Sequence, residues 1–392
     1  MNIREFDIPA QRQGTGCMKW DWDQKRTGRD GLTPFWVADM DFLAPPVVRQ
    51  ALQKRMDHGI FGYSFCPDSM MESLISWFSR RHHWEIPSQS IVEIPGIVPG
   101  IYSFIREFTQ PGEAVVIQEP VYYPFRQALE RNHRTVAVNN LVQNEDGQWE
   151  MDLEGLESTL QETGAKVMIF CSPHNPVGRV WKKSELMALA KVCKHYDVTV
   201  ISDEIHADLV HKGPTHVPWL SLPEESLPPS LALLAPTKTF NIPGIPTAFA
   251  VIPRSEVRTR YAQALRASGY SGEASPLAYV AAESAYNQGE PWLEALLDYL
   301  AQNDAYLRER LHKALPQISL SPLEGTYLEW LNLGEAGWKD EKPVWEKLLD
   351  AGVWLSPGSD FGAAGAGHLR MNIACPKSQL EVGIEALISV LS

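Results

Sequence analysis

The sequence lacks the features that mark disulfide-rich, zinc-binding or membrane proteins. Its five cysteines are scattered, odd in number and without a Cys-x-x-Cys pair, which argues against a disulfide framework or a zinc knuckle and favours reduced thiols. No apolar run approaches the length of a membrane span, and the opening MNIREFDIPAQRQ contains no apolar signal segment. We therefore expect a cytoplasmic protein that has no membrane partner and binds no metal.

The chain also lacks an excess of positive charge, internal repeats and low-complexity runs. With 35 Lys and Arg against 48 Asp and Glu, its net charge is −13. A nucleic-acid partner is not expected, because such a partner requires a basic face to neutralise its phosphates. The length of 392 residues exceeds the size at which one hydrophobic core usually stops growing, so two domains are expected.

What the sequence does contain is a series of short apolar stretches that alternate with helix-like segments, such as KKSELMALAKVCKHYD (182–197). Each stretch is apolar nearly throughout, which is typical of strands buried on both faces. Strands that alternate with helices form a mostly parallel sheet flanked by helices, so the expected fold class is α/β. The predicted strands are 114–118, 134–138, 166–170, 198–202, 231–235 and 248–252.

The character of the sequence changes near residue 290. The segment 292–315 reads as a long amphipathic helix, and GTYLEWLNL, the helix-like KPVWEKLLDAG and a Gly-rich stretch follow it. We predict a large domain at 49–290 and a smaller α+β domain at 291–392. The apolar FWVADMDF (35–42) predicts that the N-terminal segment 1–48 crosses between the domains and packs with the small one.

Polar and aromatic side chains follow four of the predicted strands. In open α/β sheets ligands bind beyond the carboxyl ends of the strands, so these side chains are expected to meet at one rim. They are Tyr122 and Tyr123 after 114–118, Asn175 after 166–170, Asp203 and His206 after 198–202, and Lys238 after 231–235.

This set of side chains suits one cofactor. A lysine that directly follows an apolar strand is placed for burial, which lowers the amine pKa and lets it capture a carbonyl group as a Schiff base. Pyridoxal phosphate also needs a carboxylate at its ring nitrogen, a stacking ring, polar groups at its phenolic oxygen and backbone amides at its phosphate. The candidates, in that order, are Asp203, Tyr122, Asn175 with His206, and the segment 95–105. Taken singly, each is more typical of a turn, a cap or the core; their order and spacing favour the cofactor site.

Motifs spread nearly end to end carry a family resemblance. They are KWD, FWVADMDF, HGIFGYS, PGIVPGI, EPVYYPF, CSPHNPVGRVW, VISDEIHADL, APTKTFNIPG, GTYLEWL and GHLRMNIACP. With these motifs the chain resembles the fold-type I pyridoxal-phosphate enzymes of the class I/II aminotransferase superfamily. It resembles more closely the MalY/PatB branch of cystathionine and cysteine-S-conjugate β-lyases.

The resemblance implies how the cofactor is held. Lys238 would bind it covalently, Asp203 would face its ring nitrogen, and Tyr122 would stack on the ring. Asn175 and His206 would lie near its phenolic oxygen. The phosphate contacts would come from the backbone at Ile97 and Val98, from Thr237, and from Tyr63 reaching across from a second subunit of a homodimer.

The resemblance also implies a substrate contact and two departures. Arg370 would clamp the α-carboxylate of a small amino-acid substrate, a bidentate task that suits a guanidinium, with Asn175 and Tyr63 also near the substrate. His206 stands where many aminotransferases carry tyrosine. Ala235 stands where many carry a serine, whose hydroxyl Thr237 would replace in part. Both departures also occur in the lyase branch and favour a lyase.

We therefore expect a β-elimination from an L-amino acid that carries sulfur at Cβ, yielding a thiol, pyruvate and ammonia. Lys238 would remove the Cα proton, and Tyr122, Tyr123 or Lys238 would assist proton transfer to the leaving thiolate. An aminotransferase is the alternative. A third reading is a cofactor-binding regulatory module without turnover, although the N-terminus offers no basic DNA-binding segment for it.

Two further features are interpreted as structural. GAAGAG (362–367) resembles half of a dinucleotide fingerprint, but no strand–turn–helix unit follows it. A flexible loop near the substrate entrance is predicted there instead. His82 and His83 have no partner at metal-ligand spacing and are predicted to lie at the surface.

Overall fold

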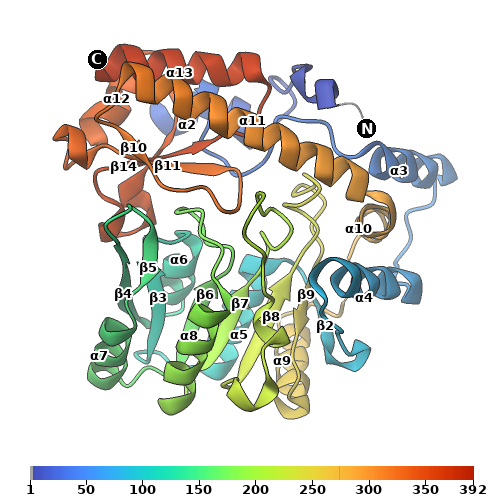
Figure 1. Cartoon of the computed structure of the whole chain (residues 1–392). Coiled ribbons are helices and arrows are strands. Elements are labelled where there is room, and N and C mark those ends of the chain that lie inside the picture. The colour runs from blue at the N-terminus through green and yellow to red at the C-terminus, as the bar shows by residue number, and fades with distance from the viewer. Residues whose placement is uncertain (1–2, 273) are drawn as a thin grey trace.

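An eight-stranded mixed sheet forms the centre of the larger part of the molecule (Figure 1). The computed structural model describes residues 3–272 and 274–392. Five neighbouring strands, from β8 to β4 in the order below, run parallel, and the strands beyond them at either edge bring in the antiparallel pairings. In sheet order the strands are β2 (Ile91–Ile94), β9 (Ala248–Val251), β8 (Ser230–Leu234), β7 (Thr199–Asp203), β6 (Val167–Cys171), β3 (Ala114–Glu119), β4 (Thr135–Gln143) and β5 (Trp149–Met151).

The predicted α/β class with a mostly parallel sheet is confirmed, and each of the six predicted stretches overlaps a strand of this sheet, extending at most one residue beyond it. Every residue of β6 and nearly every residue of β7 is buried, which explains why their sequences are apolar throughout. The sequence does not predict β2 and β5. Both are short edge strands that stay partly exposed, so their apolar signal is weak.

Helices cover both faces of the large sheet. On one face, α5 (Ile97–Phe108), α6 (Pro124–Arg131) and α9 (Ser255–Ala267) share a core with sheet residues such as Ile117 and Ile201. On the other face, α7 (Leu153–Thr163) and α8 (Lys183–His195) pack against Val116 and Val200. The parallel strands are therefore covered on both sides, and their carboxyl ends are left open at one rim.

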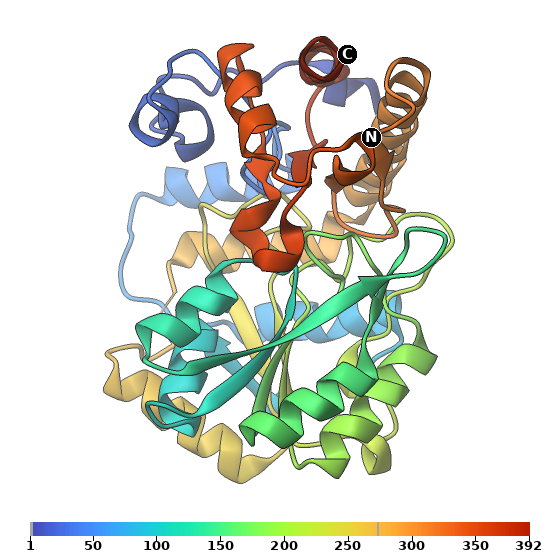
Figure 2. The same ribbon diagram turned by 90° about the vertical axis from the view of Figure 1, so that its left-hand side faces the viewer.

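The smaller part of the molecule is a four-stranded antiparallel sheet covered by helices, which lies above the large sheet in Figure 2. Its strands, in sheet order, are β10 (Ser319–Leu320), β11 (Leu328–Asn332), β14 (His368–Asn372) and β13 (Ser356–Pro357). Its helices are α11 (Glu290–Ala314), α12 (Lys342–Asp350) and α13 (Lys377–Leu391). Beside it, α10 (Pro276–Gln288) packs on α3 (Pro46–His58) and α4 (Asp68–His82). The predicted second, α+β unit is confirmed.

The N-terminal segment contacts both parts of the molecule. It contains α1 (Met18–Asp21), α2 (Asp23–Thr27) and β1 (Thr33–Pro34), which pairs in parallel with β12 (Val353–Trp354). Asn372 N donates to Phe35 O at 2.9 Å, and Met40 N donates to Asn241 Oδ1 at 2.9 Å. Of the predicted segment 1–48, residues 1 and 2 lie outside the described residues.

The prediction that His82 lies at the surface is wrong. Its side chain is only 5% exposed, and its Nε2 lies 2.7 Å from Asp208 Oδ1. His82 follows the buried Leu74 and Phe78 at four-residue spacing on α4, so it belongs to the buried face of that helix. The adjacent His83 is exposed, as predicted. The four-residue spacing of Leu74, Phe78 and His82 therefore indicates in the sequence itself that His82 is buried.

The backbone of GAAGAG (362–367) is more regular than the flexible loop that the sequence predicts. Short 3₁₀ helices span Gly358–Phe361 and Ala363–Gly365, and β14 follows them. Two buried carboxylates hold the segment: Glu119 Oε2 accepts from Ala363 N at 3.1 Å, and Glu341 Oε2 accepts from Gly367 N at 2.8 Å. A side chain at Gly362 would collide with Glu119, and its φ of 111° favours glycine.

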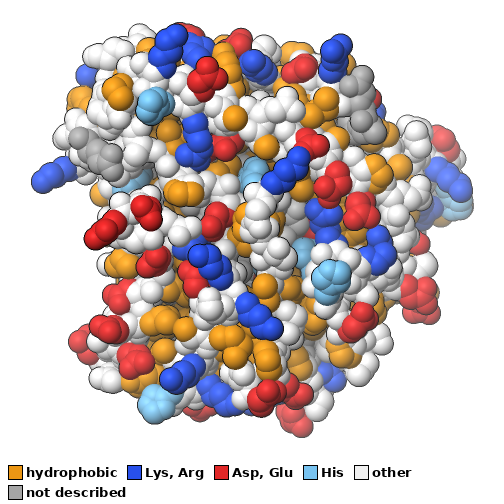
Figure 3. Space-filling view, in the orientation of Figure 1, with side chains coloured by type: hydrophobic (Ala, Val, Ile, Leu, Met, Phe, Trp, Pro, Cys, Tyr) orange, Lys and Arg blue, Asp and Glu red, His pale blue; other side chains and the backbone are white. Residues whose placement is uncertain are grey.

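Acidic and basic side chains are interspersed over the face shown in Figure 3, so this face carries no continuous basic surface for nucleic acid. Among the helices of residues 3–272 and 274–392, none has the length and apolar character of a membrane span. All five cysteines are free thiols.

Candidate active site

A cavity of about 400 Å³ lies at the carboxyl ends of β6, β7 and β8, and we call it the inner cavity. Its wall also includes the start of α5 and the chain that follows β3. Most of the predicted site residues line it, although they come from distant parts of the sequence. They are Ile97, Val98, Tyr122, Asn175, Asp203, His206, Thr237 and Lys238.

Lys238 lies in the turn that follows β8 and borders the inner cavity. Its Nζ donates a hydrogen bond to Ala38 O, in the N-terminal segment. Burial lowers the pKa of its ammonium to about 8; the positive charge of Arg370 lowers it further, and Asp39 opposes the shift. Part of the amine is therefore neutral near physiological pH, as its position after an apolar strand predicts.

Asp203 ends β7 and is 3% exposed. Its Oδ1 accepts a hydrogen bond from Ile205 N at 3.1 Å. Burial raises the pKa of this carboxyl to about 7, and the neighbouring Glu204 adds to the shift. Burial also lowers the pKa of His206 to about 3, so that its imidazole is neutral. His206 Nδ1 is buried and has no hydrogen-bond partner within the described chain.

Arg370, on β14, extends from the small sheet toward the loop that follows β6. Its Nη1 donates to Asn175 Oδ1 at 3.1 Å, and its Nη2 donates to Trp36 O. The guanidinium lies 4.7 Å from the ring centre of Phe361. Burial lowers the pKa of Arg370 to about 10, so it remains a cation. Its buried Nε has no partner among the residues described and is free for a ligand.

A second cavity, of about 550 Å³, adjoins the first and shares Ala38, Tyr122, Lys238 and Pro243 with it. We call it the outer cavity. Arg370 and Tyr123 line the outer cavity. Every predicted site residue except Tyr63 therefore borders the inner or the outer cavity. Sequence reasoning missed part of its wall: Arg26, Trp36, Ala38, Asp39, Ser356, Asp360 and Phe361. Trp36, Ala38 and Asp39 belong to FWVADMDF, whose two carboxylates within an apolar run were the available signal.

A buried carboxylate supports the turn that carries Lys238. Asp208 Oδ2 accepts from Thr239 Oγ1 at 2.8 Å, and its Oδ1 accepts from Trp77 Nε1 at 2.9 Å. Thr239 is the residue after Lys238, and Trp77 lies on α4. These hydrogen bonds connect the lysine turn to a helix of the core, which restricts where the amine can lie.

The structure does not bring Tyr63 to either cavity. Its side chain is fully exposed and lies in an extended segment between α3 and α4. Within this chain Tyr63 lines neither the inner nor the outer cavity.

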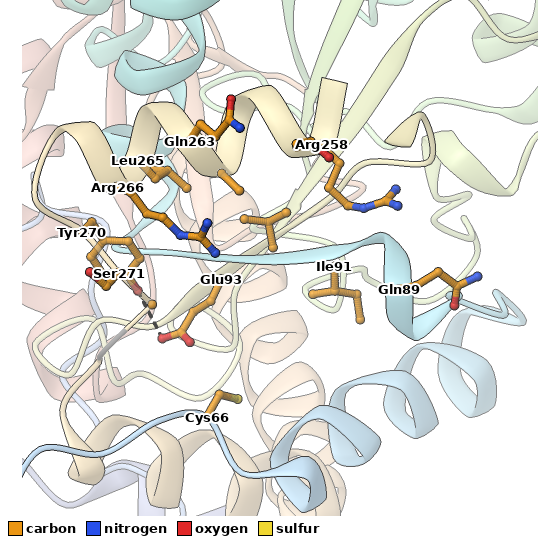
Figure 4. A pocket seen from close by; sticks show the side chains of 14 residues that line it. Cys66, Gln89, Ile91, Glu93, Arg258, Gln263, Leu265, Arg266, Tyr270 and Ser271 are labelled. Atoms are coloured by element: carbon orange, nitrogen blue, oxygen red, sulfur yellow. Dashed lines mark hydrogen bonds between the residues drawn. The ribbon is translucent and has the colours of Figure 1, made fainter. Parts of the chain in front are cut away.

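Another cavity, of about 560 Å³, lacks the chemistry of the first two (Figure 4). Among the described residues of its wall, the one carboxylate is that of Glu93, which accepts hydrogen bonds from Tyr270 OH at 3.1 Å and Tyr279 OH at 2.7 Å. Burial, together with the charge of Glu93, raises the pKa of the Cys66 thiol to about 12. Cys66 therefore stays protonated and is a poor nucleophile.

Comparisons with known proteins agree with this geometry. The family "Aminotransferase class I and II" matches residues 32–387. Cystathionine β-lyase PatB of Bacillus subtilis is 36% identical over 387 residues, which cover 99% of this chain and 100% of that protein.

Two solved structures are also similar to this chain. A pyridoxal-phosphate-bound, putative aminotransferase from Clostridium difficile has a TM-score of 0.95 at 36% identity, covering 99% of both chains. Cystalysin from Treponema denticola, which contains pyridoxal 5′-phosphate, has a TM-score of 0.93 at 32% identity, covering 98% of both chains. With a family match over nearly its whole length, this chain belongs to the class I and II aminotransferase family.

Proposed function

We propose that the protein is a pyridoxal-phosphate-dependent carbon–sulfur lyase, which converts cystathionine or another S-substituted L-cysteine to a thiol, pyruvate and ammonia. One observation carries the proposal: a partly neutral amine, Lys238, and a buried guanidinium, Arg370, face the same pair of adjoining cavities. The similarity to cystathionine β-lyase PatB and to cystalysin supports it.

The inner cavity fits the cofactor in its size and in the groups it offers. Its volume of about 400 Å³ lies within the range of small-molecule sites. His206 Nδ1 has no hydrogen-bond partner in the described residues and is free for the phenolic oxygen. Asp203 uses Oδ1 for Ile205 N, which leaves its second oxygen for the ring nitrogen. The α5 helix begins at Ile97, so its first N–H groups are available to a phosphate.

When bound, pyridoxal phosphate supplies an aldehyde that combines with amines and a ring that withdraws electrons from the substrate Cα. The protein supplies the rest. Asp203 would hold a proton on the ring nitrogen, and Tyr122 would stack on the ring. Thr237 would contribute a hydroxyl near the phosphate, where Ala235 offers none.

Substrate orientation would depend on Arg370. Its free Nε and one Nη can donate two parallel hydrogen bonds to an α-carboxylate, while Asn175 Oδ1 and Trp36 O hold the rest of the guanidinium. Because Arg370 has only 3% of its surface exposed, solvent screens this charge weakly. The Cα–H bond is then presented toward Lys238.

Two proton transfers would complete the reaction. The neutral form of Lys238 Nζ accepts the proton from Cα. Burial keeps the pKa of the Tyr122 hydroxyl well above its usual range, so this phenol stays protonated and can donate to the leaving thiolate, as can Tyr123 or the protonated Lys238. The thiol leaves, and the released enamine takes up one water to give pyruvate and ammonia.

The proposed function is tested with a panel of S-substituted L-cysteines, including cystathionine, and the purified holoenzyme. We expect pyruvate and free thiol to appear in equal amounts. An absence of pyruvate with the whole panel would contradict the proposal. The alternative, an aminotransferase, is favoured by the similarity to the putative aminotransferase of C. difficile. It predicts glutamate from 2-oxoglutarate and the substrate, with no thiol released. A regulatory module would give neither product.

Replacing Arg370 by lysine is expected to raise KM for the amino-acid substrate by about tenfold or more, because one ammonium cannot reproduce two parallel hydrogen bonds. Steady-state kinetics measures this change. The exposed Arg254→Lys serves as the matched control, since Arg254 lines neither the inner nor the outer cavity. Unchanged kinetics in Arg370→Lys would remove Arg370 from the substrate site.

We also propose that the enzyme is a cytoplasmic homodimer in which Tyr63 reaches the partner's phosphate site. The segment that carries Tyr63 exposes a row of apolar side chains: Ile60 (65%), Phe61 (52%), Tyr63 (100%) and Phe65 (81%). An exposed apolar patch of this kind is typical of an interface. The free cysteines are consistent with a reducing compartment.

The shared site predicts complementation. Tyr63→Ala is expected to weaken cofactor binding about tenfold by loss of a phosphate hydrogen bond. Mixing it with inactive Lys238→Ala should recover activity, because a hybrid dimer contains one site with both native residues. Activity and cofactor content are measured after subunits are exchanged. Failure of hybrids, verified by differential tagging, to recover activity would contradict the shared site.

A further inference from the structure

The wall of the outer cavity carries a cation and an anion that the proposed reaction does not use. They are Arg26, on α2, and Asp360, in the 3₁₀ helix Gly358–Phe361. Within residues 3–272 and 274–392, neither side chain forms a hydrogen bond or an ion pair. Two charges of opposite sign, neither in a hydrogen bond or an ion pair with a described residue, therefore border the space beyond Arg370.

Arg26 is held by aromatic rings. Its guanidinium lies 4.8 Å from the ring centre of Trp36 and 5.8 Å from that of Trp22. Trp36 in turn stacks on Trp354, with ring centres 4.2 Å apart and an interplanar angle of 18°. This stack orients the guanidinium and leaves its N–H groups unused, so they are available to a ligand carboxylate.

Asp360 is positioned by the segment around it. Ser359 N, one residue before it, donates to the buried Glu341 at 2.7 Å, and Phe361, one residue after it, contacts the guanidinium of Arg370. Burial raises the pKa of the Asp360 carboxyl, while the positive charges of Arg370 and Arg26 lower it. Asp360 thus lies within electrostatic reach of the guanidinium that would bind the α-carboxylate and of the unused one.

Building on the proposed function, we infer that Arg26 and Asp360 form a second amino-acid recognition site. It binds the zwitterionic head at the far end of a substrate whose leaving group is itself an amino acid. Arg26 pairs with the distal carboxylate and Asp360 with the distal ammonium. The preferred substrates are then thioethers that carry an amino-acid group at each end, such as cystathionine, rather than cysteines with a neutral S-alkyl group.

The opposite charges also select against other leaving groups. A distal group with only a carboxylate would meet the repulsion of Asp360, and one with only an ammonium would meet that of Arg26. A neutral alkyl group would pair with neither charge. The zwitterion is the one head group in this set that pairs with both.

The first test compares two substrates in the holoenzyme: L-cystathionine and S-ethyl-L-cysteine. Arg26→Gln and Asp360→Asn are each expected to lower kcat/KM for cystathionine about tenfold, the effect of losing one charge-assisted hydrogen bond. Both variants should lower kcat/KM for S-ethyl-L-cysteine much less than for cystathionine, so that the ratio of the two values falls in each variant. Equal losses with both substrates, or no loss with cystathionine, overturn the inference.

Matched controls come from the same helix and the loop that follows it. Lys25 neighbours Arg26, and Asp30 is exposed a few residues later; neither lines the outer cavity. Lys25→Gln and Asp30→Asn change the net charge in the same way as the two test variants. If the controls lower cystathionine turnover as much as the test variants do, the effect is one of general charge and the specific site is overturned.

A second measurement does not depend on turnover. L,L-2,7-Diaminosuberate is the carbon analogue of cystathionine, and L-norleucine is that of S-ethyl-L-cysteine; neither carries a thiolate leaving group. Calorimetry should show diaminosuberate binding more tightly than norleucine to wild type, with the difference lost in Arg26→Gln. If no substrate yields pyruvate, the proposed function fails, and the affinities of the two analogues alone then test the second amino-acid recognition site. Equal affinities of diaminosuberate and norleucine for wild type would overturn that site.

Discussion

Replacing Lys238 by alanine is expected to lower the elimination rate by about 10³-fold or more. General base catalysis contributes about 10²–10⁴-fold, and the same residue is proposed to bind the cofactor covalently. The fold itself should survive. The side chain borders two cavities and makes one hydrogen bond, to Ala38 O, and its turn is held through Thr239 and Asp208.

The measurement combines kinetics with chemical trapping. Borohydride treatment followed by denaturation should leave the cofactor attached to wild type and remove it from Lys238→Ala. Lys238→Arg is the informative companion. It keeps a positive charge that can donate to Ala38 O, yet arginine does not become neutral at physiological pH, so it should be as inactive as alanine. Cofactor that stays attached to either variant would assign the covalent bond to another lysine.

The sequence predicts the central strands and the rim of the site because both depend on local patterns. β6 and β7 are apolar along their length, since both faces are covered. Asp203 ends its strand, and Asn175 and Lys238 lie in the turns after theirs, so the parallel topology is enough to bring them together. Their roles come from the family resemblance, and their common cavity comes from the structure.

The residues that sequence reasoning missed depend on long-range contacts. Arg26 and Asp360 are far apart in the chain, and they border the same cavity because β1 pairs with β12. No local pattern marks such a pairing, since each of these strands has two residues. His82 is a different case. Its four-residue spacing from Phe78 on α4 indicates the buried face of that helix, whereas the prediction rested on the absence of a partner at metal-ligand spacing.

Asp203→Asn is expected to lower elimination by about 10³-fold, an effect typical of removing a group that stabilises charge in the transition state. The carboxylate is proposed to hold a proton on the cofactor's ring nitrogen, and a neutral amide cannot. Asparagine has nearly the same shape, and its Oδ1 can still accept from Ile205 N. Steady-state pyruvate formation measures the loss. Activity within tenfold of wild type would contradict the assigned role.

The same substitution should stabilise the cofactor-free protein. Burial raises the native pKa of Asp203 from 3.8 to about 7, so between these values the native state binds more protons than the unfolded state. Native stability therefore falls as pH rises through this window, by about 4 kcal/mol for a shift of this size. Asparagine has no ionisable group, so the variant does not lose this stability as pH rises.

Urea denaturation should give Asp203→Asn a higher midpoint than wild type at pH 8, and the difference between the two midpoints should be smaller at pH 5. A lower midpoint for the variant at pH 8 would mean that Asp203 is stabilised there by a partner other than the cofactor. A higher midpoint for the variant would show that Asp203 destabilises the cofactor-free fold, as expected of a residue that serves the reaction.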